Sequence, residues 1–326
     1  MKTGKVPENV LKRSILKKTG SKRSEVRTGA GVGTDCACVE FGDGEGVFLS
    51  SNPVTVLSEN IGLYAVHSAV NNIAASGAEP VGIMVTELLP TSFEEDDIKA
   101  VTKDLDEVTK ALKIQIIGGH TEITDAVSRP VLSITAVGKA PFNSDKKSKA
   151  RPGDDVIITK WIGLEGTSLI AKAKEKELLK KFPPKLIYDS KNYDRFLSVV
   201  PEAATAVKSG VTAMHDISKG GVFGALWEMA ERSGVGLLID LRKIPVKQET
   251  VEICNFFDIN PYELLSGGSM LMTAEDGNRL VMDLAEKGIE AAIIGKCTDN
   301  NDRVLLNGEM KRFLEPSKTD ELYKVI

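Results

Sequence analysis

Cysteine and histidine are scarce in this sequence, with four cysteines and three histidines among 326 residues. No two cysteines stand in a C-x-x-C pair, which argues against a structural zinc site and against a disulfide framework. Cys36 and Cys38 alternate within a predicted strand, and we expect all four thiols to be small buried side chains. A catalytic triad or a histidine-rich metal site would have to use His67, His120 or His215.

Long apolar runs and a strong excess of one charge are also missing. No apolar run reaches the roughly 18 residues that a membrane span needs. The N-terminus MKTGKVPENV lacks the apolar core of a secretory signal. A net charge of −4 gives no global electrostatic reason for binding nucleic acid or a membrane surface. We therefore expect a cytoplasmic protein with neither kind of partner.

The remaining composition is that of an ordinary globular protein, with 42% apolar and 27% charged residues. A chain of 326 residues is long enough for two domains of about 150 residues each. Residues 1–28 hold nine Lys or Arg against two Glu and predict a basic arm, either a solvated tail or a segment that folds over a phosphate-bearing ligand. The polar stretch PFNSDKKSK then divides an N-terminal domain, 29–145, from a C-terminal domain, 146–326.

Hydrophobic periodicity predicts alternating strands and helices in both halves. In the first half, strands are expected over 47–50, 81–88, 114–117 and 131–137, with a helix over 61–76 and a second one opened by a capping box at Ser92–Glu95. In the second half, strands are expected over 156–159, 236–240, 269–273 and 291–296, with helices after Gly166 and over 222–232. The fold class is therefore α/β or α+β, and the pattern alone does not decide whether the sheets are parallel.

Four glycine-rich or polar segments of the first half stand beside predicted strands, where ligands usually bind. These segments are GTDCA with Asp35, SSNPVT with Asn52, NNIAASGA with Asn72, and GGHTE from Gly118 to Glu122. Asp35 taken alone reads equally well as a turn residue. Asn72 within an apolar helix also fits a helix-packing hydrogen bond. The pair Gly118-Gly119 would let a ligand approach the backbone closely.

One segment of the second half has the same character. MHDISKGG joins a strand that carries His215 and Asp216 to a helix that starts near Gly220 and Gly221. Helix N-termini present N–H groups that favour an anion. The Gly-Gly pair does not have P-loop spacing, so by itself it indicates a phosphate site only weakly.

Several segments, taken together and in order, resemble the aminoimidazole ribonucleotide (AIR) synthetase superfamily. They are GVGTDCACVE, SSNPVT, IGLYAVHSAVNNIAASGAEPVGIMVTELLP, IIGGHTEIT, TKWIGLEGTSLIA and MHDISKGGVFGALWEMAERSGVGLLID. The branch with hydrogenase-maturation proteins is the most similar one, and selenophosphate synthetase and thiamine monophosphate kinase are its relatives. The resemblance implies two α/β domains and a homodimer in which N-terminal strands form a shared barrel. It also implies an ATP site with Mg²⁺ near that interface, and phosphorylation of a carbonyl or amide oxygen.

The resemblance also assigns residues, and several acidic positions of the family are changed. Asp35 matches a family Asp, but Asn52, Asn72 and His120 stand where relatives usually carry carboxylates. Glu122 is the candidate replacement. Mg²⁺ prefers carboxylate oxygens, and imidazole suits softer metals, so we expect weakened turnover of Mg-ATP.

The resulting hypothesis is an ATP-using enzyme that activates an oxygen of a small carboxylate or amide. The expected metal ligands are Asp35 and Glu122, the expected ATP-binding residues are Asn52, Asn72, Gly118, Gly119, Thr121, Gly220 and Gly221, and the expected catalytic residues are His120, His215 and Asp216. The alternative is a dimeric nucleotide or metabolite sensor without turnover. The chain ends in Lys-Val-Ile and lacks the terminal cysteine of the hydrogenase-maturation dehydratases, so that carbamoyl chemistry is not expected.

Overall fold

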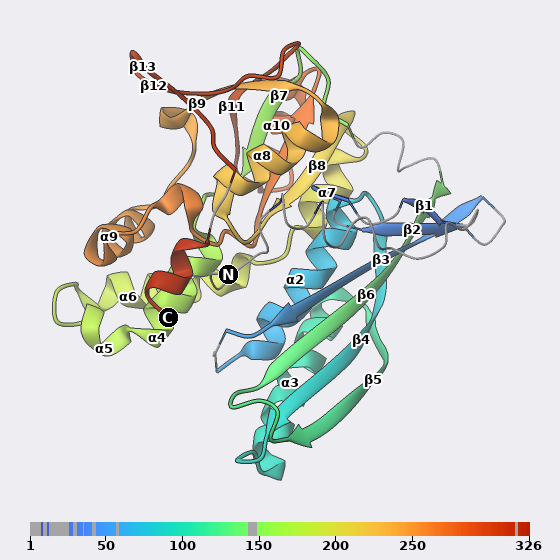
Figure 1. The fold of residues 1–326 in the computed structure, drawn as a ribbon, viewed down its shortest axis with the longest axis vertical. Coiled ribbons are helices and arrows are strands. Elements are labelled where there is room, and N and C mark those ends of the chain that lie inside the picture. Colours follow the sequence, from blue (N-terminus) through green and yellow to red (C-terminus); the bar gives the residue numbers. More distant parts are fainter. Residues whose placement is uncertain are drawn as a thin grey trace. The chain divides into compact units, whose positions relative to one another are not determined.

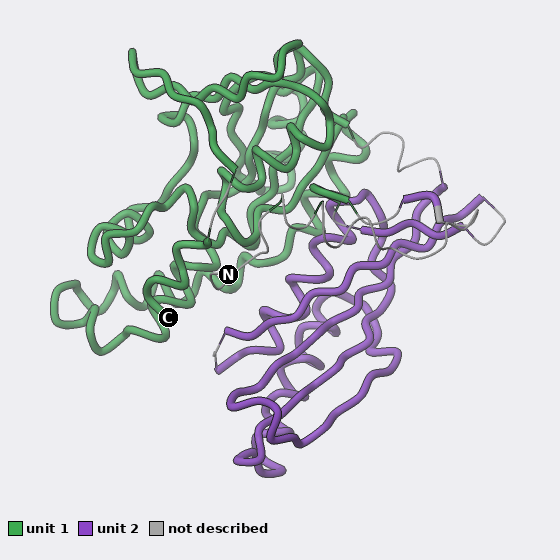
Figure 2. Tube along the Cα trace, viewed as in Figure 1, with its two compact units in different colours: residues 1–23, 30–34, 145–326 green, residues 24–29, 35–144 purple. Residues whose placement is uncertain are grey.

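The structure is a computed structural model that describes residues 8, 12, 26–28, 31–34, 36–40, 44–56, 59–142, 149–316 and 319–326. Its contacts divide the chain into two compact units (Figure 2). We call Ser24–Gly29 with Asp35–Ser144 the N-terminal unit, and Met1–Arg23 with Ala30–Thr34 and Asp145–Ile326 the C-terminal unit. Most of the predicted basic arm, residues 1–28, lies outside the described residues. No described helix is long and apolar enough to cross a membrane.

The N-terminal unit is a six-stranded sheet with two helices on one face (Figure 1). Its strands are β1 (Val26–Thr28), β2 (Ala37–Glu40), β3 (Glu45–Val54), β4 (Glu79–Pro90), β5 (Gln115–Thr124) and β6 (Val131–Pro141), and its helices are α2 (Ile61–Ala75) and α3 (Glu95–Leu112). The strand order is β1-β2-β3-β6-β4-β5, and only the β4–β5 pair is parallel. Helix α3 connects these two parallel strands, as a crossover must.

The core of the N-terminal unit lies between this sheet and helix α2. Alternate residues of β4 and β6, such as Ile83 and Ile134, are fully buried on the helix side. On the other face, where the described residues place no helix, Val81, Met84 and Ile117 are 45%, 48% and 52% exposed. The predicted apolar strand over 81–88 is thus confirmed, and one of its faces is left uncovered within the chain.

Three predicted boundaries in this unit are wrong. The N-cap of α3 is Glu94, whose backbone N–H donates to Asp97 Oδ2 at 2.9 Å, so the capping box begins two residues after Ser92. The segment with Asn52 does not follow a strand but belongs to β3. Likewise β5 does not end at Gly118 but continues to Thr124, because its backbone stays paired with β4 past the two glycines.

The C-terminal unit is built on a seven-stranded sheet in the order β13-β12-β9-β11-β7-β10-β8. Its strands are β7 (Asp155–Thr159), β8 (Val211–Ile217), β9 (Gly236–Asp240), β10 (Ser269–Ala274), β11 (Ala291–Thr298), β12 (Arg303–Asn307) and β13 (Met310–Phe313). Its α-helices are α4 (Leu164–Ala173), α5 (Glu175–Leu178), α6 (Pro184–Lys191), α7 (Val200–Ala206), α8 (Gly221–Ser233), α9 (Gln248–Phe257) and α10 (Gly277–Ala285). Short 3₁₀ helices are η3 (Asn192–Phe196), η4 (Leu241–Lys243), η5 (Pro261–Glu263) and η6 (Glu321–Lys324).

The C-terminal unit has an apolar core around its sheet and a separate group of helices. The buried residues Ile158, Leu271 and Leu226 join β7 and β10 to α8 in one apolar core. Helices α4, α6 and α9 contact one another and form a separate helical group (Figure 1). The predicted strands over 156–159, 236–240, 269–273 and 291–296 and the helix over 222–232 are confirmed. All four cysteines are buried thiols, as expected.

Candidate functional site

Two asparagines of the N-terminal unit lie between strand β3 and helix α2. Asn52 is on the helix-facing side of β3 and donates its Nδ2–H to the carbonyl oxygen of Ser68 at 3.0 Å. Asn72, on α2, donates its Nδ2–H to Ser50 Oγ at 2.8 Å. The two amides therefore belong to one polar layer between β3 and α2. Both bonds pair polar groups in a partly buried place.

The segment beside Asp35 reaches the same layer. The Cys36 thiol donates to the carbonyl oxygen of Asn72 at 3.1 Å. Asp35 itself lies outside the described residues. Three of the four polar segments of the first half thus meet where β2, β3 and α2 come together, which is what a shared binding site requires.

The fourth segment lies on β5, which is separated from β3 by two strands of the sheet, β6 and β4. His120 and Glu122 point to the same side, with Nε2 and Oε2 3.4 Å apart, and both side chains are exposed. Thr121 points to the opposite side and donates to Glu87 Oε2 at 2.6 Å. Because Glu87 shares the helix-facing side of the sheet with Asn52, Glu122 lies on the other face. Within one chain, Glu122 and Asn52 do not form one ligand set.

The two glycines of β5 have different surroundings. A Cβ atom on Gly119 would lie 2.0 Å from the carbonyl oxygen of Val85 on β4, so glycine is required there by the neighbouring strand. A Cβ atom on Gly118 would meet nothing within 4 Å. The contact between strands explains Gly119 without a ligand, whereas nothing in the packing explains Gly118.

Glu87 is a site candidate that the sequence interpretation missed. Its side chain is 5% exposed, and Thr121 is its hydrogen-bond donor. The signal was present in the sequence, since Glu87 occupies an inward position in the alternation that places Val85 and Leu89 in the core. A carboxylate at such a position is unusual unless it has a partner.

The described residues of the β3–α2 layer do not fit a Mg²⁺ ion by themselves. Asn52 and Asn72 offer neutral amide groups, whereas Mg²⁺ favours carboxylate oxygens and phosphates. Over the described ranges, no group of three or more His, Cys, Asp or Glu side chains is arranged to hold a metal ion. The metal roles of Asp35 and Glu122 stay predictions.

In the C-terminal unit, His215 and Asp216 are neighbours on β8 and are 5% and 3% exposed. Nε2 of His215 lies 2.9 Å from Oε2 of Glu228 on α8. The histidine is thereby held between the sheet and α8, next to a carboxylate. This contact orients the imidazole ring.

The start of α8 has an acceptor from within the chain. Gly220 and Gly221 both have positive φ, 91° and 61°, which glycine adopts without strain. The backbone N–H of Gly220 donates to Asp320 Oδ2 at 2.6 Å, and Asp320 Oδ1 accepts from the N–H groups of Leu265 and Leu322. The anion at this helix start is therefore Asp320, which no local sequence signal indicated.

Near this helix start lies Glu165, in the first turn of α4. A Cβ atom on Gly267 would lie 1.9 Å from Glu165 Oε2, so the carboxylate fills the space above a glycine. Burial raises the pKa of Glu165 to about 8, Lys219 opposes this rise, and the charges of Asp320 and Asp216 add to it. At neutral pH such a group can both donate and accept a proton.

Both halves of the chain match models of one family. Residues 33–140 match the N-terminal domain of AIR synthase related proteins, and residues 151–306 match the C-terminal domain. A protein of Methanocaldococcus jannaschii named for hydrogenase expression and formation is 28% identical over 93% of this chain and 91% of its own length. Carbamoyl dehydratase HypE of Rhizobium leguminosarum bv. viciae is 29% identical over 75% of this chain and 70% of its own length.

A solved structure shares the fold. Hydrogenase maturation protein HypE in complex with ATP superposes with a TM-score of 0.73 at 20% identity, over 89% of this chain and 91% of that one. The resemblance that the sequence motifs predicted is confirmed over both halves of the chain. This chain belongs to the AIR synthase related family.

Proposed function

We propose that this protein binds ATP and uses it to phosphorylate an oxygen of a small carboxylate or amide. The observation that carries the proposal is the polar layer between β3 and α2, where Asn52, Asn72 and the segment beside Asp35 meet. This layer lies in the half of the chain that matches the N-terminal domain of AIR synthase related proteins, and a solved structure with the same fold is a complex with ATP. Amide groups in such a layer can hydrogen-bond phosphate oxygens.

In the C-terminal unit, the proposal gives Glu165 the proton transfer and His215 with Asp216 the orientation of the substrate. A pKa of about 8 lets Glu165 hold a proton at neutral pH and release it when the leaving group needs one. Asp216 is 3% exposed and raises that pKa through its negative charge. The predicted roles of the β5 segment stay proposals: Gly118 and Thr121 at the nucleotide, with Thr121 on the same side of the sheet as Asn52, and His120 in catalysis, on the other side.

The proposal includes a homodimer. The face of the N-terminal sheet opposite α2 carries the exposed side chains of Val81, Met84 and Ile117. A sheet face with several exposed apolar side chains is typical of a surface that another chain covers. Its occupant in the proposal is the same face of a second copy, giving a barrel of two sheets.

A second function is a nucleotide sensor without turnover, and one observation favours it. Asn52 and Asn72 place neutral amides where the family usually carries carboxylates, so the metal that assists phosphoryl transfer would be held weakly. Such a protein would keep the fold, the dimer and the nucleotide, and would lose the chemistry.

Two measurements on purified protein separate the two functions. Phosphate release from ATP is followed with Mg²⁺ or Mn²⁺, alone and with a panel of small carboxylates and amides, and ATP binding is followed by titration calorimetry. Release that depends on an added substrate and falls at least about tenfold in Glu165→Gln supports the enzyme. Binding without release under every condition supports the sensor. If ATP does not bind at all, both functions are wrong.

A further inference from the structure

The C-terminal unit contains a cavity of about 430 Å³ that the proposed function does not use. The aromatic side chains of Trp161, Tyr193 and Phe196 line it, together with the cations Arg195 and Lys247 and the carboxylates Asp189, Glu249 and Glu290. A volume of this size lies within the range of ligand pockets, which run from about 300 to 1,000 Å³. The cavity can therefore hold a small molecule.

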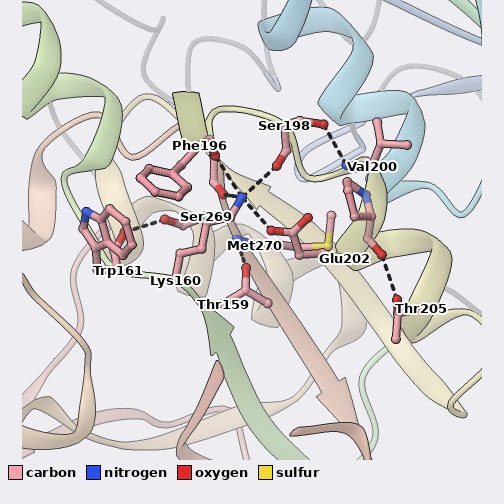
Figure 3. A network of polar contacts seen from close by, with 12 residues as sticks. Thr159, Lys160, Trp161, Phe196, Ser198, Val200, Glu202, Thr205, Ser269 and Met270 are labelled. Carbon is pink, nitrogen blue, oxygen red and sulfur yellow. Dashed lines mark hydrogen bonds and ion pairs between the residues drawn. The ribbon is translucent and has the colours of Figure 1, made fainter. Parts of the chain in front are cut away.

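A buried lysine fixes one side of this cavity (Figure 3). Lys160 Nζ donates to the carbonyl oxygens of Phe196, Ser198 and Gly268 at 2.8, 2.7 and 2.8 Å, and it pairs with Glu202 at 2.6 Å. Burial lowers the pKa of Lys160, and the Glu202 charge opposes that change. With four acceptors around one ammonium group, Lys160 is a structural clamp that holds the segment of Phe196 in place.

The aromatic wall is rigid for the same reason. The ring of Trp161 meets Tyr193 and Phe196 edge to face, with centroids 5.1 and 5.2 Å apart. Trp161 is 6% exposed and Tyr193 is 7% exposed, and the Tyr193 hydroxyl donates to Glu249 Oε2 at 2.7 Å. A planar apolar ligand would find a prepared surface here and would cost the protein little ordering.

Two donors beside this wall lack acceptors. The indole Nε1–H of Trp161 is buried and makes no hydrogen bond within the described part of the chain, and it points away from Lys160 (Figure 3). Arg195 lies 4.7 Å from the centroid of Phe196 and forms no ion pair with a described residue. A buried indole N–H without an acceptor is rare in proteins and indicates that something else accepts from it.

A third donor is only weakly engaged. Lys247 Nζ lies 4.8 Å from the ring centroid of Trp161 and 3.3 Å from Glu290, and the Lys247 and Glu290 side chains are 42% and 71% exposed. An exposed ion pair of this kind contributes little and is readily exchanged. Lys247 is thus available to a second anion at the face of Trp161.

We propose that this cavity binds a small aromatic carboxylate. Its ring would lie on the wall of Trp161, Tyr193 and Phe196, and its carboxylate would accept from Trp161 Nε1–H and Lys247, with Arg195 as a further cation. The three carboxylates of the lining already accept from side chains, Asp189 from Lys185, Glu249 from Tyr193 and Glu290 from Lys247. The ligand would supply a further acceptor for Trp161 Nε1–H and Arg195. The inference is independent of the proposed function, because none of these residues serves in that function.

The test uses three probes of one size that differ in charge. Benzoate, benzamide and benzylammonium are titrated into the full chain carrying Trp227→Phe, so that Trp161 is the single tryptophan of the two in the sequence that remains. The change in Trp161 fluorescence and the heat in calorimetry report binding. We expect saturable binding of benzoate, binding of benzamide at least about tenfold weaker, and no saturable binding of benzylammonium. Equal or tighter binding of benzylammonium, or no saturation by benzoate up to millimolar concentrations, overturns the proposal.

Two lysine variants test where the carboxylate of the ligand binds. Lys247→Met keeps most of the aliphatic stem and removes the charge, and it should weaken benzoate binding about tenfold. Lys243→Met removes a charge from an exposed residue of η4 outside the cavity lining and should leave the affinity unchanged. Thermal unfolding confirms that both variants are folded. If the two variants bind benzoate with the same affinity, the carboxylate is not at Lys247 and the assignment is wrong.

Discussion

The carboxylate of Asp320 accepts a hydrogen bond from the backbone N–H of Gly220 at 2.6 Å, and it thereby closes the start of helix α8 with a residue 100 positions away in the chain. Asp320 is 4% exposed and also accepts from the N–H groups of Leu265 and Leu322. One side chain thus ties the C-terminal segment, the turn before β10 and the first turn of α8 together. The negative charge also interacts favourably with the positive end of the helix dipole.

Replacing Asp320 by Ala should therefore destabilise the C-terminal unit strongly. Three N–H groups would lose their acceptor in a buried place, which we expect to cost about 3 kcal/mol of unfolding free energy, measured by urea denaturation. The matched control is Asp276→Ala, which removes the exposed N-cap of α10 and should cost only about 1 kcal/mol. Equal losses of unfolding free energy in the two variants would show that the three hydrogen bonds of Asp320 contribute no more than one exposed helix cap.

Glu165 should give the protein a measurable pH dependence. Its pKa rises from 4.5 to about 8 on folding, so the folded state holds a proton that the unfolded state releases. This contribution is fully present below pH 4.5 and is lost as the pH rises toward 8, with a slope of at most about 1.4 kcal/mol per pH unit. Glu165→Gln stays neutral, so its stability relative to the unchanged protein should rise between pH 5 and pH 8. A constant difference across that range would show that Glu165 is charged in the folded state.

Local sequence patterns predicted most of the helices and strands, because the apolar spacing within a segment depends only on the residues of that segment. The apolar spacing around Ile73 predicted helix α2, and the alternation through Ile83 predicted β4. The end of β5 was misjudged because glycine weakens the strand pattern, while in the structure the backbone of Val85 keeps the pairing intact across Gly119. Pairing with a neighbouring strand is a nonlocal interaction, and one sequence does not display it.

The same distinction between local patterns and nonlocal contacts applies to the residues of the candidate sites. Asn52 and Asn72 could be brought together only through the family resemblance, since 20 positions separate them and the contact depends on how β3 meets α2. Asp320 gave no signal, because its role depends on Gly220. The cavity at Trp161 gave none either, since its wall comes from residues that look like ordinary core aromatics in the sequence. Family motifs identify positions, and the fold decides which side chains meet.

The N-terminal arm should contribute to the stability of the C-terminal unit. Glu8 accepts from the indole Nε1–H of Trp227 at 2.9 Å, and Lys12 pairs with Glu231 at 2.8 Å. Glu8→Ala removes the acceptor of a part-buried donor and should lower the unfolding free energy by about 1 kcal/mol. Lys12→Ala breaks a more exposed pair and should cost less than about 0.5 kcal/mol. Chemical denaturation followed by Trp227 fluorescence measures both losses. A larger loss in Lys12→Ala than in Glu8→Ala would contradict the proposed contact between Glu8 and Trp227.

The proposed dimer can be tested on the uncovered face of the N-terminal sheet. Met84 is 48% exposed there, and Met84→Glu places a charge where the second copy should lie. Light scattering at micromolar concentration should find the unchanged protein near twice 35.1 kDa and the variant near 35.1 kDa. The control is Met310→Glu, at a 68% exposed position of β13 in the C-terminal unit, which should leave the mass unchanged. A monomer in the unchanged protein would rule out the dimer directly.

The double change Asn52→Asp and Asn72→Asp tests whether the polar layer between β3 and α2 is a former metal site. Two carboxylates beside the phosphates should hold Mg²⁺, and even outer-shell partners of a metal are worth about 10–100-fold in affinity. ATP binding in the presence of Mg²⁺ should therefore tighten by roughly tenfold or more, as measured by titration calorimetry. Without a divalent metal, the same carboxylates repel the phosphates and ATP binding should weaken.

The opposite changes in ATP affinity with and without Mg²⁺ distinguish a metal site from a general loss of stability. Aspartate cannot donate the hydrogen bonds that Asn52 gives to Ser68 and Asn72 gives to Ser50, so the variant should be less stable with or without metal. That loss alone would change ATP binding equally in both conditions. The control for added charge is Asn301→Asp with Asn307→Asp, at two exposed positions of the C-terminal unit, where we expect no metal dependence. Equal shifts of ATP affinity with and without Mg²⁺ in the Asn52 and Asn72 variant would show that these amides only satisfy local hydrogen bonds and that the ATP phosphates lie elsewhere.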